Sequence, residues 1–449
     1  MANVIKLRKG LNIHLKGTAA QTKRVVGACT EYVVRPDTFE GVVPKLVVHE
    51  GDRVDVGDAL FVDKNFPEVR FASPVSGTVK AVERGERRKI LGIRLQADEV
   101  QKYHDFGRRD VSSLSSDDVK NALLEAGLFG YIYQLPYAVS TNPQTMPKGI
   151  FVSALRDMPL ANNFEYELQG NERDFQTGLT ALSKMATTYL GIGKNQKADA
   201  LVNAKDVEVM VFDGPCPAGN VGVQVNHISP VNKGEVVWTV DPTFVIFFGR
   251  LFNTGKVNLL RTIALGGSAM ASPMYVDALI GTPFSVILKD ALTRQEDLRL
   301  INGNPLTGTK SCLEDSVGVR TSEITAIPEG ADANEMFGWI LPRTNQFSTS
   351  RSYFSWLMGK KAYDLDARVK GGERHIIMSG EYDSVLPMDI YGEFLIKAII
   401  VGDIDKMEQL GIYEVSPEDF ALAEFVDSSK LELQRIVRQG LNMLRKENA

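Results

Sequence analysis

The stretch from His49 to Val79 reads HEGDRVDVGDALFVDKNFPEVRFASPVSGTV, and it decides the fold of the first part of the chain. Two Gly-Asp pairs, Gly51-Asp52 and Gly57-Asp58, lie six residues apart among alternating apolar and polar positions. Alternation with a period of two indicates β-strands, and glycine accepts the positive φ angle that tight turns between strands require. The stretch therefore predicts short, twisted hairpins.

This pattern resembles the barrel-sandwich fold of biotinyl and lipoyl carrier domains. In those domains a lysine at the tip of a hairpin carries the prosthetic group, and Lys64 lies near the corresponding position here. A carrier module that uses Lys64 is therefore one alternative, although a shared fold does not imply a shared function and the residues after the lysine read NFPEV. The mass of the intact chain tests it, because a lipoyl or biotinyl group on Lys64 would add to that mass.

The composition indicates a globular chain of several domains. A chain of 449 residues is too long for one core, and we expect roughly three or four domains. Its residues are 44% hydrophobic and 24% charged, without the signature of disorder, and its net charge of −5 favours no nucleic-acid partner. We recognise no signal peptide and no apolar run near the ~20 residues of a membrane span, so we expect a cytoplasmic chain.

The cysteines and histidines are scattered and show no ligand spacing. They are Cys29, Cys216, Cys312, His14, His49, His104, His227 and His375. The sequence contains no C-x-x-C, H-E-x-x-H or Walker A motif, and three cysteines cannot supply a four-cysteine iron–sulfur cluster. No acid–base pair, nucleophile or metal constellation stands out either. We therefore predict no catalytic residue and no metal site in this chain.

We expect a multidomain fold of the α/β class. The expected domains are a barrel-sandwich domain over 1–105, a Rossmann-like α/β domain over 106–256, a β-grasp module of the SLBB type over 257–330, and a mostly helical domain over 331–449. The α/β domain is predicted from alternating patterns. They indicate helices at 115–127, 172–190 and 243–251, and strands at 150–155, 207–212 and 235–240.

The last two domains are predicted in the same way. In the β-grasp module we expect a short helix near 275–280 and a strand at 283–288. In the helical domain, Ser416 with Pro417 at the first helical position begins one helix. A capping box over 429–432 begins the last helix. Its buried stripe comprises Leu433, Ile436, Val437, Leu441 and Leu444.

Four aromatic residues fall within the segment LFGYIYQLPY at 128–137. They are Phe129, Tyr131, Tyr133 and Tyr137. Aromatic side chains are most often buried for packing. The functional alternative is an apolar wall for a quinone ring or its isoprenoid tail, since each buried CH₂ of a tail contributes ~0.8 kcal/mol. We predict quinone contact for these four residues under that alternative.

Three later blocks carry a resemblance to a known family. They are NHISPVNKGEVVWTVDPTFVIFFGRLFNTG at 226–255, GWILPRTNQFSTSRSYF within 336–354, and HIIMSGEYDSVLPMDIYGEFLIKAIIVGDIDKMEQLG within 374–411. Together with the Gly-Asp hairpins, they resemble the A-subunit family (NqrA) of the bacterial Na⁺-translocating NADH:quinone oxidoreductase. The resemblance covers nearly the whole chain. Its middle and later blocks are specific, whereas many carrier domains share the hairpins.

The resemblance implies a place in an enzyme complex. That complex moves electrons from NADH through flavins and iron to ubiquinone or menaquinone, and it exports Na⁺. The family member is a peripheral component on the cytoplasmic side of the bacterial inner membrane, with the B to F subunits as partners. The flavins, the iron centres, the NADH site and the Na⁺ path belong to those partners, while the family itself is a candidate for quinone handling.

The family is similar in domain order to the flavin-binding subunit of respiratory complex I and to the C subunit of the Rnf complex. Those relatives carry a glycine-rich flavin loop and clustered cysteines. Here only Gly127 and Gly130 stand where the loop would fall, between bulky aromatic residues, and the region near the C-terminus reads ALAEFVDSSKLEL. A flavin phosphate needs several free N–H donors and close approach of the backbone.

We therefore expect no FMN, no iron–sulfur cluster and no other redox cofactor in this chain. The aromatic residues at 129–137 would fill the place of a flavin. A free-standing flavin oxidoreductase is the remaining alternative, and a yellow purified chain would support it.

Overall fold

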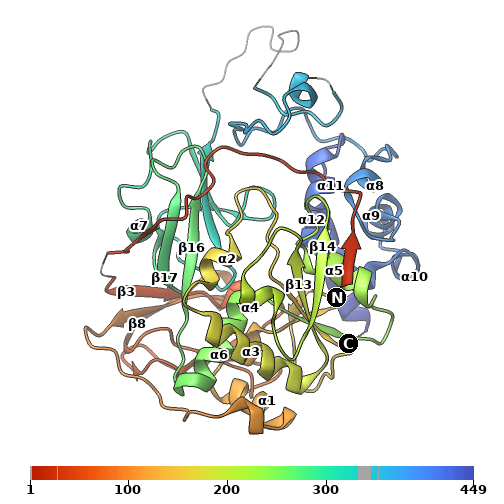
Figure 1. Cartoon of the computed structure of the whole chain (residues 1–449). Coiled ribbons are helices and arrows are strands. Elements are labelled where there is room, and N and C mark those ends of the chain that lie inside the picture. Colours follow the sequence, from red (N-terminus) through yellow and green to blue (C-terminus); the bar gives the residue numbers. More distant parts are fainter. Residues whose placement is uncertain (1–2, 28, 332–344, 352, 449) are drawn as a thin grey trace.

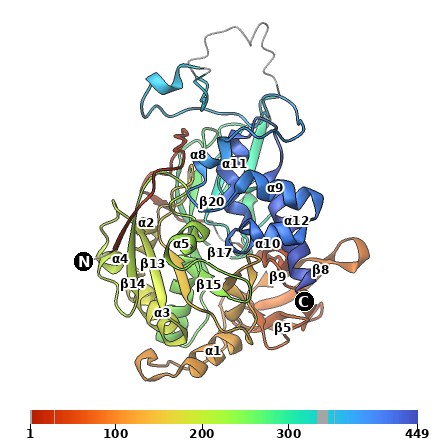
Figure 2. The same ribbon diagram turned by 90° about the vertical axis from the view of Figure 1, so that its right-hand side faces the viewer.

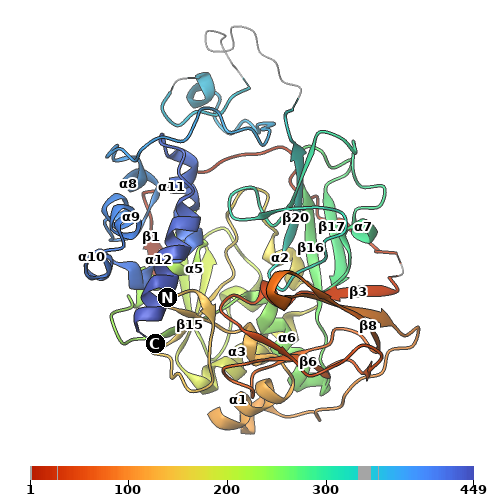
Figure 3. The ribbon, with the colours of Figure 1, turned by 180° about the vertical axis from the view of Figure 1, so that it is seen from behind.

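The computed structural model describes residues 3–27, 29–331, 345–351 and 353–448. Their strands form a seven-stranded, a six-stranded, a four-stranded and a three-stranded sheet. Figure 1 shows the two small sheets below, the large sheet in the centre, the six-stranded sheet on the left and the C-terminal helices on the right. Figures 2 and 3 show the same arrangement from the side and from behind.

The first domain is built from the two small sheets. One contains β3 (Glu31–Val34), β5 (Arg53–Val54), β8 (Gly77–Arg84) and β9 (Ile90–Ala97), and the other contains β4 (Pro44–Leu46), β6 (Ala59–Asp63) and β7 (Arg70–Ala72). The predicted turns are confirmed, because Gly51 and Gly57 have φ angles of 92° and 100°. Each following aspartate accepts a hydrogen bond from the amide three residues earlier, at 2.7 Å for Asp52 and 2.8 Å for Asp58. The same turn is therefore made twice.

A parallel sheet forms the centre of the second domain. Its order is β1-β14-β13-β12-β15-β10-β11. The central strands are β12 (Ile150–Ser153), β13 (Thr188–Gly193), β14 (Glu208–Asp213) and β15 (Val237–Val240), with β10 (Tyr133–Leu135) and β11 (Val139–Ser140) antiparallel at one edge. Its helices are α1 (Ser116–Glu125), α2 (Phe164–Leu168), α3 (Glu172–Met185), α4 (Asp199–Val202), α5 (Val221–Ile228) and α6 (Pro242–Thr254).

Helices α3 and α6 pack in direct backbone contact. A Cβ atom on Gly249 would lie 1.7 Å from the carbonyl oxygen of Asp174, and one on Gly178 would lie 2.0 Å from that of Val245. Only glycine fits such approaches, since larger residues would push the helices apart.

The prediction of a helix over 172–190 is right for α3 but too long, because Thr188–Gly193 belongs to β13. The apolar spacing continues through Leu190, so periodicity alone does not mark the change.

The first residues of the chain connect two domains. Strand β1 (Asn3–Lys6) pairs in parallel with β14, with Val4 opposite Val211. Strand β2 (Lys23–Arg24) pairs in parallel with β17 (Met274–Leu279) of the six-stranded sheet. Figure 1 shows this red segment crossing the molecule between the two sheets. Sequence patterns assign these residues to the first domain, because pairing with distant strands leaves no local signal.

The six-stranded sheet forms the third domain. Besides β2 and β17 it contains β16 (Leu260–Gly266), β18 (Leu298–Asn302), β19 (Thr309–Ser311) and β20 (Glu323–Pro328), and helix α7 (Phe284–Ile287) packs beside it. Two predictions are wrong here, since the expected helix at 275–280 is strand β17 and the expected strand at 283–288 contains helix α7. Pro283 precedes α7, and the apolar residues Phe284 and Ile287 are buried three positions apart, which suits one helix face.

The last domain consists of short helices around one long helix. They are α8 (Glu381–Val385), α9 (Gly392–Val401), α10 (Ile404–Gln409), α11 (Ala421–Val426) and α12 (Leu433–Glu447). The predicted stripe of α12 is confirmed, with Ile436 partly buried and the other four residues buried. Ser416 and Asp419 form a capping box at the 3₁₀ turn Pro417–Phe420 that leads into α11. Residues 332–344, which hold much of the predicted family block at 336–354, lie outside the described residues.

The predicted capping box at 429–432 is wrong. The hydroxyl of Ser429 donates to the carbonyl oxygen of His375 at 3.2 Å, and the amide of Ser429 donates to Asp427. Glu432 itself stands at the N-cap of α12 without a side-chain cap. The motif therefore supports a turn before the helix rather than the helix itself. In the described part of the chain, no helix combines the length and the apolar character needed to cross a membrane.

Candidate functional site

A cavity of about 790 Å³ opens at the carboxyl ends of β12 and β15. The strand order changes direction between these two neighbours, because β13 and β14 follow on one side of β12 and β15 lies on the other. Ligands of such sheets bind outside the carboxyl ends of the strands at this point. Residues of the third domain and of the Pro417–Phe420 turn also line the cavity. Arg35, Asp37 and Thr38 of the first domain line it as well, so four domains meet around it.

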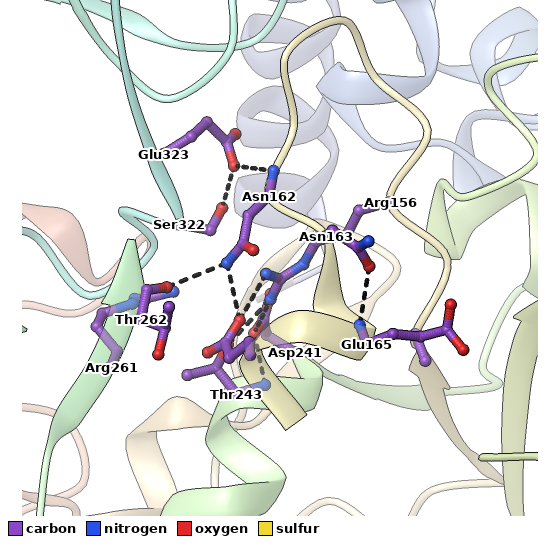
Figure 4. Close-up of polar contacts among 12 residues, drawn as sticks. Arg156, Asn162, Asn163, Glu165, Asp241, Thr243, Arg261, Thr262, Ser322 and Glu323 are labelled. Carbon is purple, nitrogen blue, oxygen red and sulfur yellow. Dashed lines mark hydrogen bonds and ion pairs between the residues drawn. The ribbon is translucent and has the colours of Figure 1, made fainter. Parts of the chain in front are cut away.

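An ion-pair network borders the cavity, and its residues Arg156 and Asp241 are part of the lining (Figure 4). Arg156, just beyond β12, contacts Glu167 at 2.9 Å and Asp241, the N-cap of α6, at 3.0 Å. The hydroxyl of Thr243 donates to Glu167 at 2.8 Å. Burial disfavours the charge of Arg156, but Asp241 and Glu167 outweigh burial and raise the pKa of Arg156. The guanidinium therefore stays charged between its carboxylates.

The same network joins the second domain to the third. The side-chain amide of Asn162 donates to Glu167 at 2.9 Å and to the carbonyl oxygen of Thr262 at 3.1 Å. Its backbone amide donates to Glu323 at 3.2 Å, and Ser322 donates to the same carboxylate at 2.7 Å. These bonds lie among buried side chains and fix the domains that enclose the cavity (Figure 4).

Carboxylates of the chain lie at the N-termini of α5 and α6, two of the helices that begin at this edge of the sheet. Asp241 accepts from the amide of Thr243 at 2.9 Å in α6. Before α5, Asp157 accepts from the amide of Gly219 at 3.0 Å, and Asp419 accepts from the side chain of Asn220 at 3.2 Å. Helix N-termini attract anions, and phosphates occupy them in nucleotide-binding folds. Here aspartates take those positions.

Two of these aspartates have raised pKa values. Burial raises the pKa of Asp157 to about 6. Burial and the neighbouring Glu418 raise the pKa of Asp419 to about 7. Burial is the dominant cause in both cases because a charged carboxylate loses hydration inside the protein.

The structure does not bring the four predicted aromatic residues to one surface. Phe129 and Tyr131 are buried in the core between the first and second domains. The ring centroid of Tyr131 lies 5.2 Å from that of Phe39 and 5.0 Å from that of Phe244. Neither residue lines the cavity, and both pack in the core as most aromatic residues do.

Of the predicted four, only Tyr133 lines the cavity. Its side chain is buried, and its hydroxyl makes no hydrogen bond to any described residue. The guanidinium carbon of Arg320 lies 3.9 Å from the centre of its ring. Tyr137 is half-buried and is not part of the cavity lining, and its hydroxyl accepts from Asn448 at 3.2 Å.

Tyr133 and Arg320 lie beside the same space, Arg320 exposed in it and the hydroxyl of Tyr133 buried without accessible surface. Burial raises the pKa of Tyr133, although Arg320 opposes the shift, so the phenol keeps its proton. Arg320 is exposed in the cavity, where lost hydration lowers its pKa less than Tyr133 and Glu418 raise it, so the pKa of Arg320 is raised. A neutral hydroxyl and a cation can together bind a carbonyl or another acceptor oxygen. The sequence offers no signal for Arg320, which belongs to a loop of the third domain.

The remaining predicted positions are spread over the molecule. Lys64 is exposed, and its amide donates to the carbonyl oxygen of Val43 at 2.8 Å. The cysteines are free; Cys29 is half-buried, Cys216 is buried and Cys312 is exposed. Within the described ranges, no three histidine, cysteine, aspartate or glutamate side chains are grouped to hold a metal ion.

Three family models match consecutive parts of the chain. They are the NqrA N-terminal barrel-sandwich hybrid domain over residues 5–98, the NqrA second alpha/beta domain over 114–257, and the NQRA C-terminal domain, an SLBB domain, over 262–312. A relative from Neisseria meningitidis serogroup B is 33% identical over 449 residues, which cover 99% of this chain and all of the relative. The chain belongs to the NqrA family. Family membership confirms the barrel-sandwich, α/β and SLBB predictions.

Other NqrA relatives are similar over their whole length. One from Haemophilus influenzae is 32% identical over 450 residues, covering 99% of this chain and all of that protein. Both relatives are named as the A subunit of the Na(+)-translocating NADH-quinone reductase.

Among solved structures, NAD⁺-reducing [NiFe]-hydrogenase in the H₂-reduced state matches with 11% identity and a TM-score of 0.36, over 48% of this chain and 47% of that chain. That similarity is too weak to support a conclusion.

Proposed function

We propose that this chain works as the peripheral A subunit of a Na⁺-translocating NADH:quinone reductase, on the cytoplasmic side of a bacterial inner membrane. The observation that carries the proposal is identity of 32–33% along the whole chain to proteins that bear the name of this component of the enzyme. The complex oxidises NADH, reduces ubiquinone or menaquinone and exports Na⁺. The B to F subunits would be the partners of this chain.

The proposal assigns no redox cofactor to this chain. The aspartates at the N-termini of α5 and α6 support this part, because a flavin phosphate there would meet Asp157, Asp241 and Asp419. The phosphate would have to displace these carboxyl groups from their donors, and those that are ionised would repel it at low dielectric. The flavins and iron centres would then belong to the partner subunits. Stoichiometric flavin or iron in the purified chain would contradict the proposal.

The proposal also gives the cavity a role in quinone handling. A quinone ring carries two carbonyl oxygens, and each accepts hydrogen bonds. Arg320 supplies donors for one of them beside a space large enough for a ring, and the buried hydroxyl of Tyr133 would add a donor once its side chain turns toward the quinone. Phe129 and Tyr131 would act behind Tyr133, by packing the segment that carries it. This narrows the predicted quinone contact to Tyr133.

The experiment uses membranes that contain the other subunits but lack this chain. Adding the purified chain back should restore NADH-dependent reduction of ubiquinone or menaquinone, and the chain should co-purify with the membrane subunits. Full quinone reduction without the chain, together with a failure to co-purify, would remove the proposed function. Co-purification without any effect on quinone reduction would instead indicate a purely structural role in the complex.

A further inference from the structure

Helix α9 is apolar on almost every side. Its sequence is GEFLIKAIIV, in which Glu393 and Lys397 are the only charged residues. Leu395, Ile396 and Ile399 are buried against the other helices of the last domain. On the α12 side, a Cβ atom on Gly440 would lie 2.8 Å from the side chain of Ile399. A helix that is apolar all round is normally covered all round.

The outer face of α9 is nevertheless open. Tyr391 is 67% exposed, Phe394 54%, Ile400 54% and Val401 79%. We call these four residues the α9 surface. The rings of Tyr391 and Phe394 contact each other, with centroids 6.4 Å apart. Figures 1 and 2 show α9 on the outside of the molecule, on the side away from the six-stranded sheet.

Glu393 does not interrupt this surface. It is buried, and it accepts from the amides of Ser379 at 3.2 Å and Gly380 at 2.7 Å. Glu393 thus faces the protein, while Lys397, the other charged residue of α9, is half-buried on the same side as Phe394 and Val401. Large aromatic and aliphatic side chains grouped on one exposed helix face mark interaction sites in soluble proteins.

Acidic residues border the α9 surface. Asp389 precedes the helix, Asp405 follows it, and Glu381 and Asp383 lie on the neighbouring α8; all four are exposed. Asp403 also follows α9 and contacts Lys406 at 3.2 Å. A border of this sign repels the anionic lipids of a membrane, which attract lysine and arginine instead. In a symmetric dimer through this face, the two acidic borders would oppose each other.

The charge therefore selects a protein partner with an apolar centre and a basic border. Loops of membrane proteins on the cytoplasmic side carry an excess of lysine and arginine. We propose that the α9 surface docks on such a loop of a membrane-spanning subunit. The surface follows from exposure and charge in this structure, whereas the identity of the partner rests on the proposed function.

The experiment compares two matched substitutions in the full chain. Val401→Glu places a charge in the α9 surface, and Val100→Glu places one in the first domain at a valine that is also 79% exposed. The complex is purified through its membrane subunits, and the amount of this chain retained is measured. Val401→Glu and Phe394→Glu should reduce retention roughly tenfold or more, and Val100→Glu should leave it unchanged.

Charge is tested by reversal of the border. Asp389→Lys combined with Asp405→Lys should also reduce retention, and added NaCl should weaken the wild-type complex. All variants should show the wild-type circular dichroism spectrum, since each changed side chain is exposed. A photo-reactive benzoylphenylalanine in place of Phe394 should cross-link to a basic loop of a membrane subunit.

The outcomes separate the surface from the proposed function. If the membrane subunits retain the wild-type chain, Val401→Glu and Phe394→Glu equally, the α9 surface is not the docking site. The proposed function would still stand. A wild-type chain that is not retained would remove both. Cross-linking of position 394 to a second copy of this chain would also overturn the inference. So would binding of the wild-type chain to phosphatidylglycerol vesicles, measured by sedimentation, if Val401→Glu abolished that binding.

Discussion

The hydroxyl of Tyr133 and the guanidinium of Arg320 are the residue pair on which quinone handling depends. Tyr133→Phe keeps the ring and its packing but removes one hydrogen-bond donor. We expect it to weaken binding of a short-chain ubiquinone by about fivefold, since one neutral hydrogen bond contributes about 1 kcal/mol. Arg320→Gln should weaken binding more, because charge-assisted bonds are roughly twice as strong. Titration of the purified chain with the quinone measures both effects.

Tyr131→Phe is the matched control for this pair. It removes a phenol hydroxyl from a residue of the same segment that does not line the cavity. The quinone affinity of this variant should equal that of the wild type. Equal losses in Tyr131→Phe and Tyr133→Phe, or no loss in Tyr133→Phe, would place the quinone elsewhere.

The buried carboxyl of Asp419 makes stability depend on pH. Its pKa is raised to about 7 in the folded chain, above the unfolded value of about 3.8. The folded state therefore binds more protons than the unfolded state between these values, so the free energy of unfolding falls as pH rises from about 4 to 7. Above that range the loss is complete.

Asp419→Asn tests this dependence because asparagine cannot ionise. Urea unfolding at pH 5, 6 and 7 should show a decrease in wild-type stability that is smaller in the variant by on the order of 1 kcal/mol. The comparison uses the change with pH in each protein, so a constant cost of the substitution cancels. Parallel pH curves for the two proteins would contradict the raised pKa.

At the scale of elements, the contact between α3 and α6 depends on two glycines. Gly249→Ala and Gly178→Ala each insert a methyl group where a carbonyl oxygen lies at 1.7 or 2.0 Å. We expect each to destabilise the chain by about 1–3 kcal/mol, the usual cost of overpacking. Urea unfolding measures it, with Gly372→Ala as the control because a Cβ atom there would meet no atom within 4 Å. An unchanged midpoint for Gly249→Ala would mean that the helices separate without cost.

Local elements are predicted from sequence only where the signal is local. The Gly-Asp turns and the Ser115 cap of α1 are confirmed, because each involves residues at most three positions apart. The region 275–288 fails because short apolar runs fit either a helix or a strand, and contact with neighbouring strands decides between them. Tyr133 could be found as one of a group of aromatics. Its partner Arg320 could not, since the fold alone brings it to the cavity.

At the scale of the whole molecule, the first strand anchors the chain in the last helical core. Leu7, just after β1, is buried in the cluster that contains Phe212 and Leu386. Leu7→Ala should therefore cost about 2–5 kcal/mol of unfolding free energy, as core truncations do. Val4→Ala in the same segment is the control, because Val4 is 54% exposed and should change stability little. Equal changes in the thermal unfolding temperature of the two variants would show that Leu7 does not pack in this core.

This long-range pairing has a consequence for biosynthesis. The residues of β1 find their partner strand β14 only after roughly 200 further residues have been made, which takes on the order of 10–40 s. During that interval Leu7 and Ile13 have none of their native neighbours from β14 or the C-terminal helices. The segment around β1 is thus among the last to become native, and we expect a chaperone that binds short apolar segments to bind it during synthesis.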